Sequence, residues 1–218
     1  MENLIIITGP TGIGKTELSL ELAKKYAGIG ASIVARIKNT RTPFSIDFGV
    51  GDVIIPHQEK RQIPTQLSGF EAPIVNTYSV ETTVAEKLDA ILDLMEFSSR
   101  MKDYYDIYYL ANKFDFNGAV LTEAILRTFE NRNRQYTMEQ FEQIMAFDSD
   151  DGMQKKWKAF SRKISSKTED FKSVLDMIKL FLEEPFKAIS EDRGYTKQWS
   201  ATEQIWVERG CSDKSGNC

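Results

Sequence analysis

Hydrophobic and polar residues follow two different patterns along the chain, strand-like before about residue 76 and helical after it. The first part contains the apolar runs LIIIT, ASIVARIKN and TPFSIDFGVGDVIIP, which are typical of strands. Between the first two runs, TELSLELAKKY has helical spacing and ends at the pair Gly28 and Gly30. Gly49 and Gly51 interrupt the last run and predict a bend or bulge. Residues 59–73 are polar and predict a loop with an edge strand.

After residue 76 the apolar positions recur every three or four residues, which predicts a body made of helices. YSVETTVAEKLDAILDLME places Val84, Leu88, Ile91 and Met95 on one face, and SSRMKDYYDIYYLANKF forms a second such helix. The predicted fold is therefore α+β, with a small, incomplete mixed-sheet head and an all-helical body. Further helices are expected near residues 118–131, 137–146, 151–164 and 168–183, with Pro185 and Gly194 marking the end of the last.

These patterns divide the chain into four segments. A strand–loop–helix segment is predicted over residues 1–30 and the remainder of the β head over 31–76. The helical domain is expected to span residues 77–200. The polar residues 201–218 are predicted to be a disordered tail.

Composition and charge exclude several classes of protein. With 41% hydrophobic residues the chain can fill a core, and its net charge of −4 gives no general attraction for nucleic acid. No apolar run approaches the length of a membrane span, and the start lacks a secretory leader, so a cytoplasmic protein is expected. The only cysteines are Cys211 and Cys218 and the only histidine is His57, which argues against zinc sites and histidine-based catalysis.

The stretch GPTGIGKT, from Gly9 to Thr16, fits the phosphate-binding loop pattern at every position. Gly9, Gly12 and Gly14 would let backbone N–H groups surround a phosphate. Lys15 would reach the β and γ oxygens of a bound NTP, and Thr16 would hold Mg²⁺. A strand before the loop and a helix after it provide the context that such a loop needs.

The first 28 residues, IIITGPTGIGKTELSLELAKKY above all, resemble the start of tRNA dimethylallyltransferases. That resemblance implies a loop that binds the pyrophosphate of a prenyl donor. Those enzymes continue with an Asp-bearing segment that meets the tRNA base, and no such segment follows Gly28. A complete phosphate-loop fold also needs several strand–helix units, and only one is visible here.

A longer resemblance covers about residues 31–200. NTRTPFSIDFGVGDVIIP and YSVETTVAEKLDAILDLMEFSSRMKDYYDIYYL resemble the nucleotidyltransferase toxins of the abortive-infection AbiEii/AbiGii family. The resemblance implies a head that transfers a nucleotide from an NTP with Mg²⁺. It also implies a helical body that closes the cleft, an antitoxin protein as partner and, for some relatives, RNA as the acceptor.

The same resemblance assigns roles to four residues. Asp47 in SIDFG matches a metal-binding carboxylate, and Lys87 in VAEKLDAI matches a helical lysine that contacts the triphosphate. Asp103 and Asp106 match the aspartates of a KDxxD motif. Ordinary structural interpretations remain open, because Asp47 is also typical of a solvated turn and Lys87 of a helix surface. Arg100–Asp103 and Lys102–Asp106 likewise have the spacing of surface ion pairs.

The expected head lacks two of its family's elements. There is no Gly-Gly dipeptide anywhere in the chain and no pair of alternating carboxylates before Asp47, and DSDD at 148–151 lies too far downstream to replace them. We therefore expect a truncated nucleotidyltransferase with reduced activity. A phosphate-loop nucleotide-binding or tRNA-prenylating protein and a non-catalytic protein that binds a partner remain as alternatives.

Overall fold

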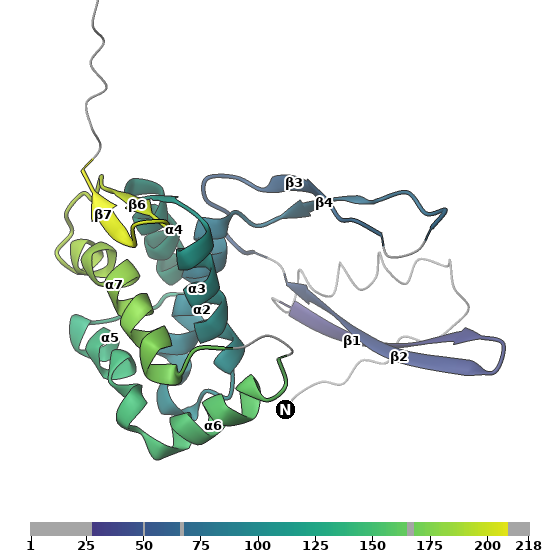
Figure 1. Cartoon of the computed structure of the whole chain (residues 1–218). Coiled ribbons are helices and arrows are strands. Elements are labelled where there is room, and N and C mark those ends of the chain that lie inside the picture. Colours follow the sequence, from purple (N-terminus) through teal and green to yellow (C-terminus); the bar gives the residue numbers. More distant parts are fainter. Residues whose placement is uncertain (1–27, 50, 66–67, 165–167, 209–218) are drawn as a thin grey trace, which may run out of the picture. The chain divides into compact units, whose positions relative to one another are not determined.

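The chain forms two units, and each has its own internal contacts. The described part of the first unit is a hairpin, and the second unit contains another hairpin and the described helices (Figure 1). The α+β class is confirmed, although the described strands pair antiparallel in separate small sheets and not in one mixed sheet. The computed structural model describes residues 28–49, 51–65, 68–164 and 168–208, and the units are Met1–Asp52 and Val53–Cys218.

The hairpin of the first unit consists of β1 (Gly28–Ile37) and β2 (Thr40–Gly49). Its antiparallel register runs from Gly28 opposite Gly49 to Ile37 opposite Thr40. At the turn Lys38 has a φ of 53°, in the left-handed region. Both strands were predicted from the sequence, but β1 begins at Gly28, where the sequence suggests only the end of a helix.

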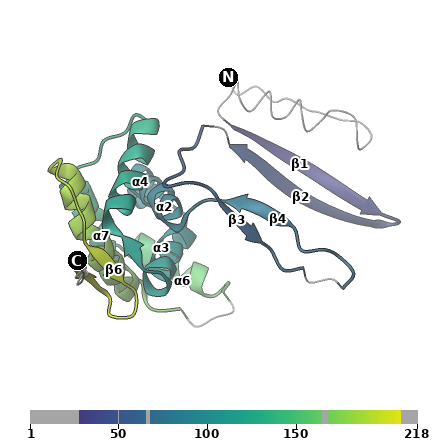
Figure 2. The same cartoon turned by 90° about the horizontal axis from the view of Figure 1, so that it is seen from above.

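A second hairpin belongs to the helical unit and leads into its first described helix (Figure 2). The strands β3 (Glu59–Gln62) and β4 (Ile74–Thr77) pair antiparallel, with Glu59 opposite Thr77. Because β3 lies in the polar stretch expected to be a loop with an edge strand, its position agrees with the sequence prediction.

All of the described α-helices except α3 (Met101–Lys113) begin after a residue whose side chain caps the helix. The side chains of Ser79, Asn117, Thr137, Asp150 and Asp170 each accept a hydrogen bond from a backbone N–H of the helix that follows, which satisfies donors that would otherwise lack a partner. The helices are α2 (Val80–Leu94), α3 (Met101–Lys113), α4 (Gly118–Asn131), α5 (Met138–Met145), α6 (Asp151–Ser161) and α7 (Phe171–Ser190), with short 3₁₀ turns at Met95–Phe97 and Phe147–Ser149.

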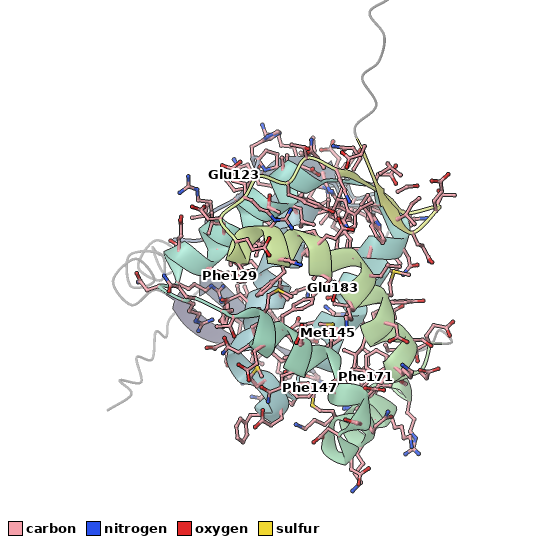
Figure 3. The ribbon with its side chains drawn as sticks, turned by 90° about the vertical axis from the view of Figure 1, so that its left-hand side faces the viewer. Glu123, Phe129, Met145, Phe147, Phe171 and Glu183 are labelled. Atoms are coloured by element: carbon pink, nitrogen blue, oxygen red, sulfur yellow. The ribbon has the colours of Figure 1, made fainter. Side chains whose placement is uncertain are left out.

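The core of the helical unit lies where α7 packs against α3, α4 and α5, and where α2 packs against α3 and α4. Phe171 of α7 and three residues from other segments, Phe129, Met145 and Phe147, are all buried in this core (Figure 3). Burial of such large side chains away from water is the main favourable term in folding. The other large side chains that are fully buried include Leu88, Ile91, Leu92, Met101, Tyr104, Ile107, Phe116, Phe141, Phe181, Phe186 and Trp199.

Helix α7 continues past Pro185 to Ser190, although the sequence suggests that the last helix ends at this proline. Proline has no N–H, so it cannot bond to the carbonyl of Phe181 one turn earlier. In its place Trp206 Nε1 donates to that carbonyl oxygen at 2.9 Å. The orphaned acceptor is thereby satisfied, and the helix tolerates the proline.

The segment after α7 returns to the helices as a small sheet. Strand β6 (Gln198–Ser200) pairs with β5 (Phe116–Asn117) and with β7 (Ile205–Val207). Trp199 is buried and donates its Nε1–H to the Ala111 carbonyl at 2.7 Å. The prediction of a disordered tail from residue 201 therefore does not hold for 205–207. Trp206 of β7 lies in the segment that was predicted to be disordered, but its ring stacks on the ring of Phe181.

Gly118, the first residue of α4, lies against this returning segment, and its replacement by alanine is expected to destabilise the fold. A Cβ there would lie 2.6 Å from both the Lys197 carbonyl oxygen and a ring carbon of Tyr195. Because a backbone atom must move, we expect Gly118→Ala to lower the free energy of unfolding by about 1–3 kcal/mol in urea denaturation. Gly194→Ala is the matched control, since its Cβ would meet no atom within 4 Å. Equal effects of the two changes would contradict the prediction.

Candidate functional site

The residues proposed from the sequence fall into three groups in the structure. The phosphate-loop residues Gly9, Gly12, Gly14, Lys15 and Thr16 lie outside the described residues. The backbone of Asp47 belongs to β2 in the first unit, opposite Gly30, and its side chain is outside the description. Lys87, Asp103 and Asp106 all lie in the helical unit. Only for this third group does the structure describe the side chains of all the residues.

Lys87 on α2 joins Asp103 and Asp106 on α3. Its Nζ lies 3.1 Å from Asp103 Oδ1 and 2.6 Å from Asp106 Oδ2. Arg100 Nε lies 2.6 Å from the other oxygen of Asp103. The Asp103 side chain is only 4% exposed, so both of its oxygens are used in a nearly buried position. We call Lys87, Arg100, Asp103 and Asp106 the Lys87 cluster.

Local structure holds the Lys87 cluster in place. Lys87 precedes the fully buried Leu88, so its stem leaves α2 at the edge of the apolar face. Asp103 lies in the first turn of α3, where a carboxylate is favoured by the positive end of the helix dipole. The Ser98 hydroxyl accepts the Arg100 backbone N–H at 3.1 Å, which fixes the turn before α3.

The surface-pair interpretation of these residues explains only part of the geometry. Arg100–Asp103 and Lys102–Asp106, at 2.6 and 3.8 Å, do form the expected pairs along one helix. Lys87, however, reaches both aspartates from another helix, and its side chain is only 18% exposed. Two carboxylates around one partly buried ammonium define its position far more tightly than a surface pair does.

The Lys87 cluster borders a pocket of about 250 Å³ in the helical unit. Three of its lining side chains are cations and two are carboxylates, so the lining carries an excess of positive charge. A pocket with convergent cations is suited to an anionic ligand such as a phosphate chain. The pocket is lined by Tyr78, Thr83, Glu86, Lys87, Ala90, Arg100, Asp103 and Arg132.

A larger pocket of about 380 Å³ contains none of the residues proposed from the sequence. It lies between α3 and α7, and its charged lining residues, Glu169 and Asp176, are both carboxylates. The field of these two groups disfavours a phosphate. We therefore assign the candidate site to the smaller pocket, because its positively charged lining fits an anionic ligand. The larger volume of the other pocket does not outweigh its negative lining.

The described residues do not form a cage for a metal ion. Among residues 28–49, 51–65, 68–164 and 168–208 no group of three or more His, Cys, Asp or Glu side chains could hold one. Both oxygens of Asp103 are already engaged by Lys87 and Arg100. The Lys87 cluster is thus organised to hold cationic side chains, and it does not fit Mg²⁺ as it stands.

A second network beside the pocket was not anticipated from the sequence. Asp89 on α2 is fully buried, and its Oδ2 accepts from Arg132 Nη1 at 2.7 Å and from Arg134 Nη1 at 2.6 Å. The Tyr136 hydroxyl donates to Asp89 Oδ1 at 3.0 Å, and burial next to this carboxylate raises the pKa of Tyr136. We call Asp89, Arg132, Arg134 and Tyr136 the Asp89 network.

Two further carboxylates of α2 extend the Asp89 network. Glu86 forms an ion pair with Arg132, and Asp93 Oδ2 lies 2.9 Å from Arg134 Nη2. In the sequence, acidic residues at 86, 89 and 93 have the spacing of one helix face, and RNR at 132–134 directly follows the helical pattern of residues 118–131. This pattern indicates an acidic helix face and a basic segment. Spacing alone does not show that the two pair with each other.

Comparison with known proteins gives one match over most of the chain. The family model described as "Nucleotidyl transferase AbiEii toxin, Type IV TA system" matches residues 3–184. The match includes Asp47, Lys87, Asp103 and Asp106. It also begins at residue 3, much earlier than the resemblance from about residue 31 that the sequence suggested.

A second match is shorter. A tRNA dimethylallyltransferase of Lactobacillus gasseri is 35% identical over 91 residues, which are 42% of this chain and 27% of that protein. The chain thus spans about a quarter of the length of this curated relative, and the match is longer than the 28 residues expected from the sequence. No solved structure matches the chain significantly. None of the helices in the described part is long and apolar enough to cross a membrane.

Proposed function

Because the chain belongs to the AbiEii nucleotidyltransferase toxin family, we propose that it transfers an NMP group from an NTP to an RNA acceptor and uses Mg²⁺. The observation that supports this proposal most is the Lys87 cluster, in which a lysine on one helix is held by two aspartates of another beside a cationic pocket. The family description also supports an antitoxin protein as partner. A cytoplasmic location is part of the same proposal.

The proposed reaction needs charge stabilisation more than covalent chemistry by the protein. The acceptor hydroxyl attacks the α-phosphorus, the bond from this phosphorus to the bridging oxygen breaks, pyrophosphate leaves and the hydroxyl proton passes to water. Negative charge grows on the leaving pyrophosphate. Lys87 and Arg100 would lie against these oxygens, where fixed cations lower the barrier without having to reorganise.

The aspartates have different proposed roles in this mechanism. Asp103 holds Lys87 and Arg100 at their nitrogen atoms, and Asp106 holds Lys87 from the other side. Both would orient the cations that bind the triphosphate. Asp47 on β2 would supply a carboxylate for Mg²⁺, whose chemistry is to neutralise charge on the phosphate oxygens.

Two other functions remain as proposals. The match to a tRNA dimethylallyltransferase favours a nucleotide- or pyrophosphate-binding role for Gly9, Gly12, Gly14, Lys15 and Thr16. The lack of alternating carboxylates before Asp47 favours a non-catalytic protein that only binds a partner, and it equally fits a truncated, less active form of the transferase proposed above.

The proposed transfer is tested by incubating the protein with each labelled NTP and total RNA, with Mg²⁺ or with EDTA. We expect label in RNA with at least one NTP in Mg²⁺ and none in EDTA, because the triphosphate needs its metal for transfer. A parallel incubation with labelled dimethylallyl diphosphate should leave the RNA unlabelled. Label from the prenyl donor alone would support the second function, and no label under any condition would support the third.

A further inference from the structure

Arg132, which follows the last residue of α4, is held in the same pocket as Lys87 by carboxylates of α2. Its Nη1 lies 2.7 Å from Asp89 Oδ2, and its Nη2 forms an ion pair with Glu86. Glu86 and Lys87 are neighbours on α2, and Glu86, Lys87 and Arg132 all line the pocket. The α4 segment thus places a third cation beside Lys87 and Arg100, although no motif in the sequence suggests it.

We propose that Arg132 contacts the phosphate chain of the bound nucleotide, and this inference rests on the proposed function of the pocket. A guanidinium has five N–H donors, and the two carboxylates use only part of this fork. The remaining donors have no hydrogen-bond partner among the residues that the structure describes. A planar fork that is already oriented binds phosphate oxygens with little further loss of side-chain entropy.

Comparison with Arg134 supports a phosphate-binding role for Arg132. Both arginines bind Asp89, and their side chains are almost equally exposed, at 32% for Arg132 and 31% for Arg134. Only Arg132 lines the pocket; the second partner of Arg134 is Asp93, outside it. Arg134 and Tyr136 alone would already provide a cation and a hydrogen bond for Asp89. A purely structural role would therefore not require Arg132 in the pocket.

The charges of the pocket point to the same ligand. Glu86 and Asp103 are its acidic lining residues, whereas Lys87, Arg100 and Arg132 are basic. Each cation is restrained by carboxylates and still faces the pocket. A linear anion with several oxygens could contact all three cations at once, which a single carboxylate could not do as well.

The inference is tested with inorganic tripolyphosphate, because this probe presents the phosphate chain without base or sugar. Calorimetry on the full chain compares wild type, Arg132→Gln, Arg134→Gln and Lys87→Ala, with thermal unfolding of each variant. We expect Arg132→Gln to weaken tripolyphosphate binding about tenfold or more, the effect of one lost charge-assisted contact. Arg134→Gln should change affinity less than about twofold while lowering the unfolding temperature as much as Arg132→Gln does.

Arg132→Lys and Arg134→Lys form a second pair in case a glutamine variant does not fold. Arg132→Lys should keep part of the affinity, since the charge remains and the fork is lost. Equal affinities for the Arg132 and Arg134 variants would overturn the inference and leave Arg132 a structural residue. Binding of tripolyphosphate that depends on Arg132, without any transfer to RNA, would support the inference while contradicting the proposed transfer. A wild-type protein that binds neither tripolyphosphate nor any NTP would overturn both.

Discussion

Replacing Lys87 by alanine is expected to lower nucleotidyl transfer about a hundredfold or more, the usual effect of removing one group that stabilises transition-state charge. The ammonium of Lys87 is the only group that joins α2 to both aspartates of the Lys87 cluster within the described residues. Without it, Asp103 and Asp106 would face the phosphate chain with one fewer compensating cation. The rate of label transfer to RNA and the NTP affinity by calorimetry both measure the loss.

Substitutions of two other lysines test whether the loss is specific to Lys87. Lys172→Ala is the matched control, because Lys172 forms an ordinary pair with Asp176 at 3.2 Å and both side chains are 64% exposed. It should leave transfer and affinity unchanged. Lys15→Ala separates the two nucleotide sites proposed from the sequence. If Lys15→Ala abolishes NTP binding and Lys87→Ala does not, the phosphate loop is the functional site and the Lys87 cluster is structural.

Replacing Asp89 by asparagine is expected to lower the free energy of unfolding by about 3 kcal/mol, which is typical when one partner of a buried ion pair is removed. Asp89 is fully buried and binds two arginines and a tyrosine hydroxyl through its two oxygens. An amide of the same shape has no charge, and it replaces one of the two acceptor oxygens by an NH2 group that faces a donor. Urea denaturation monitored by circular dichroism measures the change.

Asp93→Asn is the control for this prediction. Asp93 binds one of the same arginines at 2.9 Å, but its side chain is 41% exposed. Water can replace its contact, so we expect a loss below about 1 kcal/mol. Similar losses for Asp89→Asn and Asp93→Asn would show that burial of Asp89 adds nothing to the strength of the Asp89 network.

The helices and the Lys87 cluster could be predicted in part because their signals are local. Apolar spacing locates α2 and α3, and the family resemblance identifies Lys87 and Asp103, which the structure joins at 3.1 Å. The Asp89 network could not be predicted in the same way. Asp89 and Arg132 are 43 residues apart, and their contact depends on how α2 packs against α4. The roles of Gly9 to Thr16 and of the Asp47 side chain stay predictions.

Two differences between sequence and structure share a physical cause. Pro185 predicts the end of a helix because it lacks an N–H, and residues 201–218 predict disorder because they are polar. Neither rule includes a partner from elsewhere in the chain. Trp206 supplies the missing donor to the Phe181 carbonyl and stacks on the Phe181 ring, which extends α7 and orders β7 together.

This bond between Trp206 and Phe181 also decides where the protein can be shortened. The hydrogen-bond ladder of α7 is completed by a donor 25 residues further along the chain. A recombinant version that stops at the proline would expose the buried face of α7 and leave a carbonyl without its donor. A shortened version must therefore keep the chain through β7, which ends at Val207.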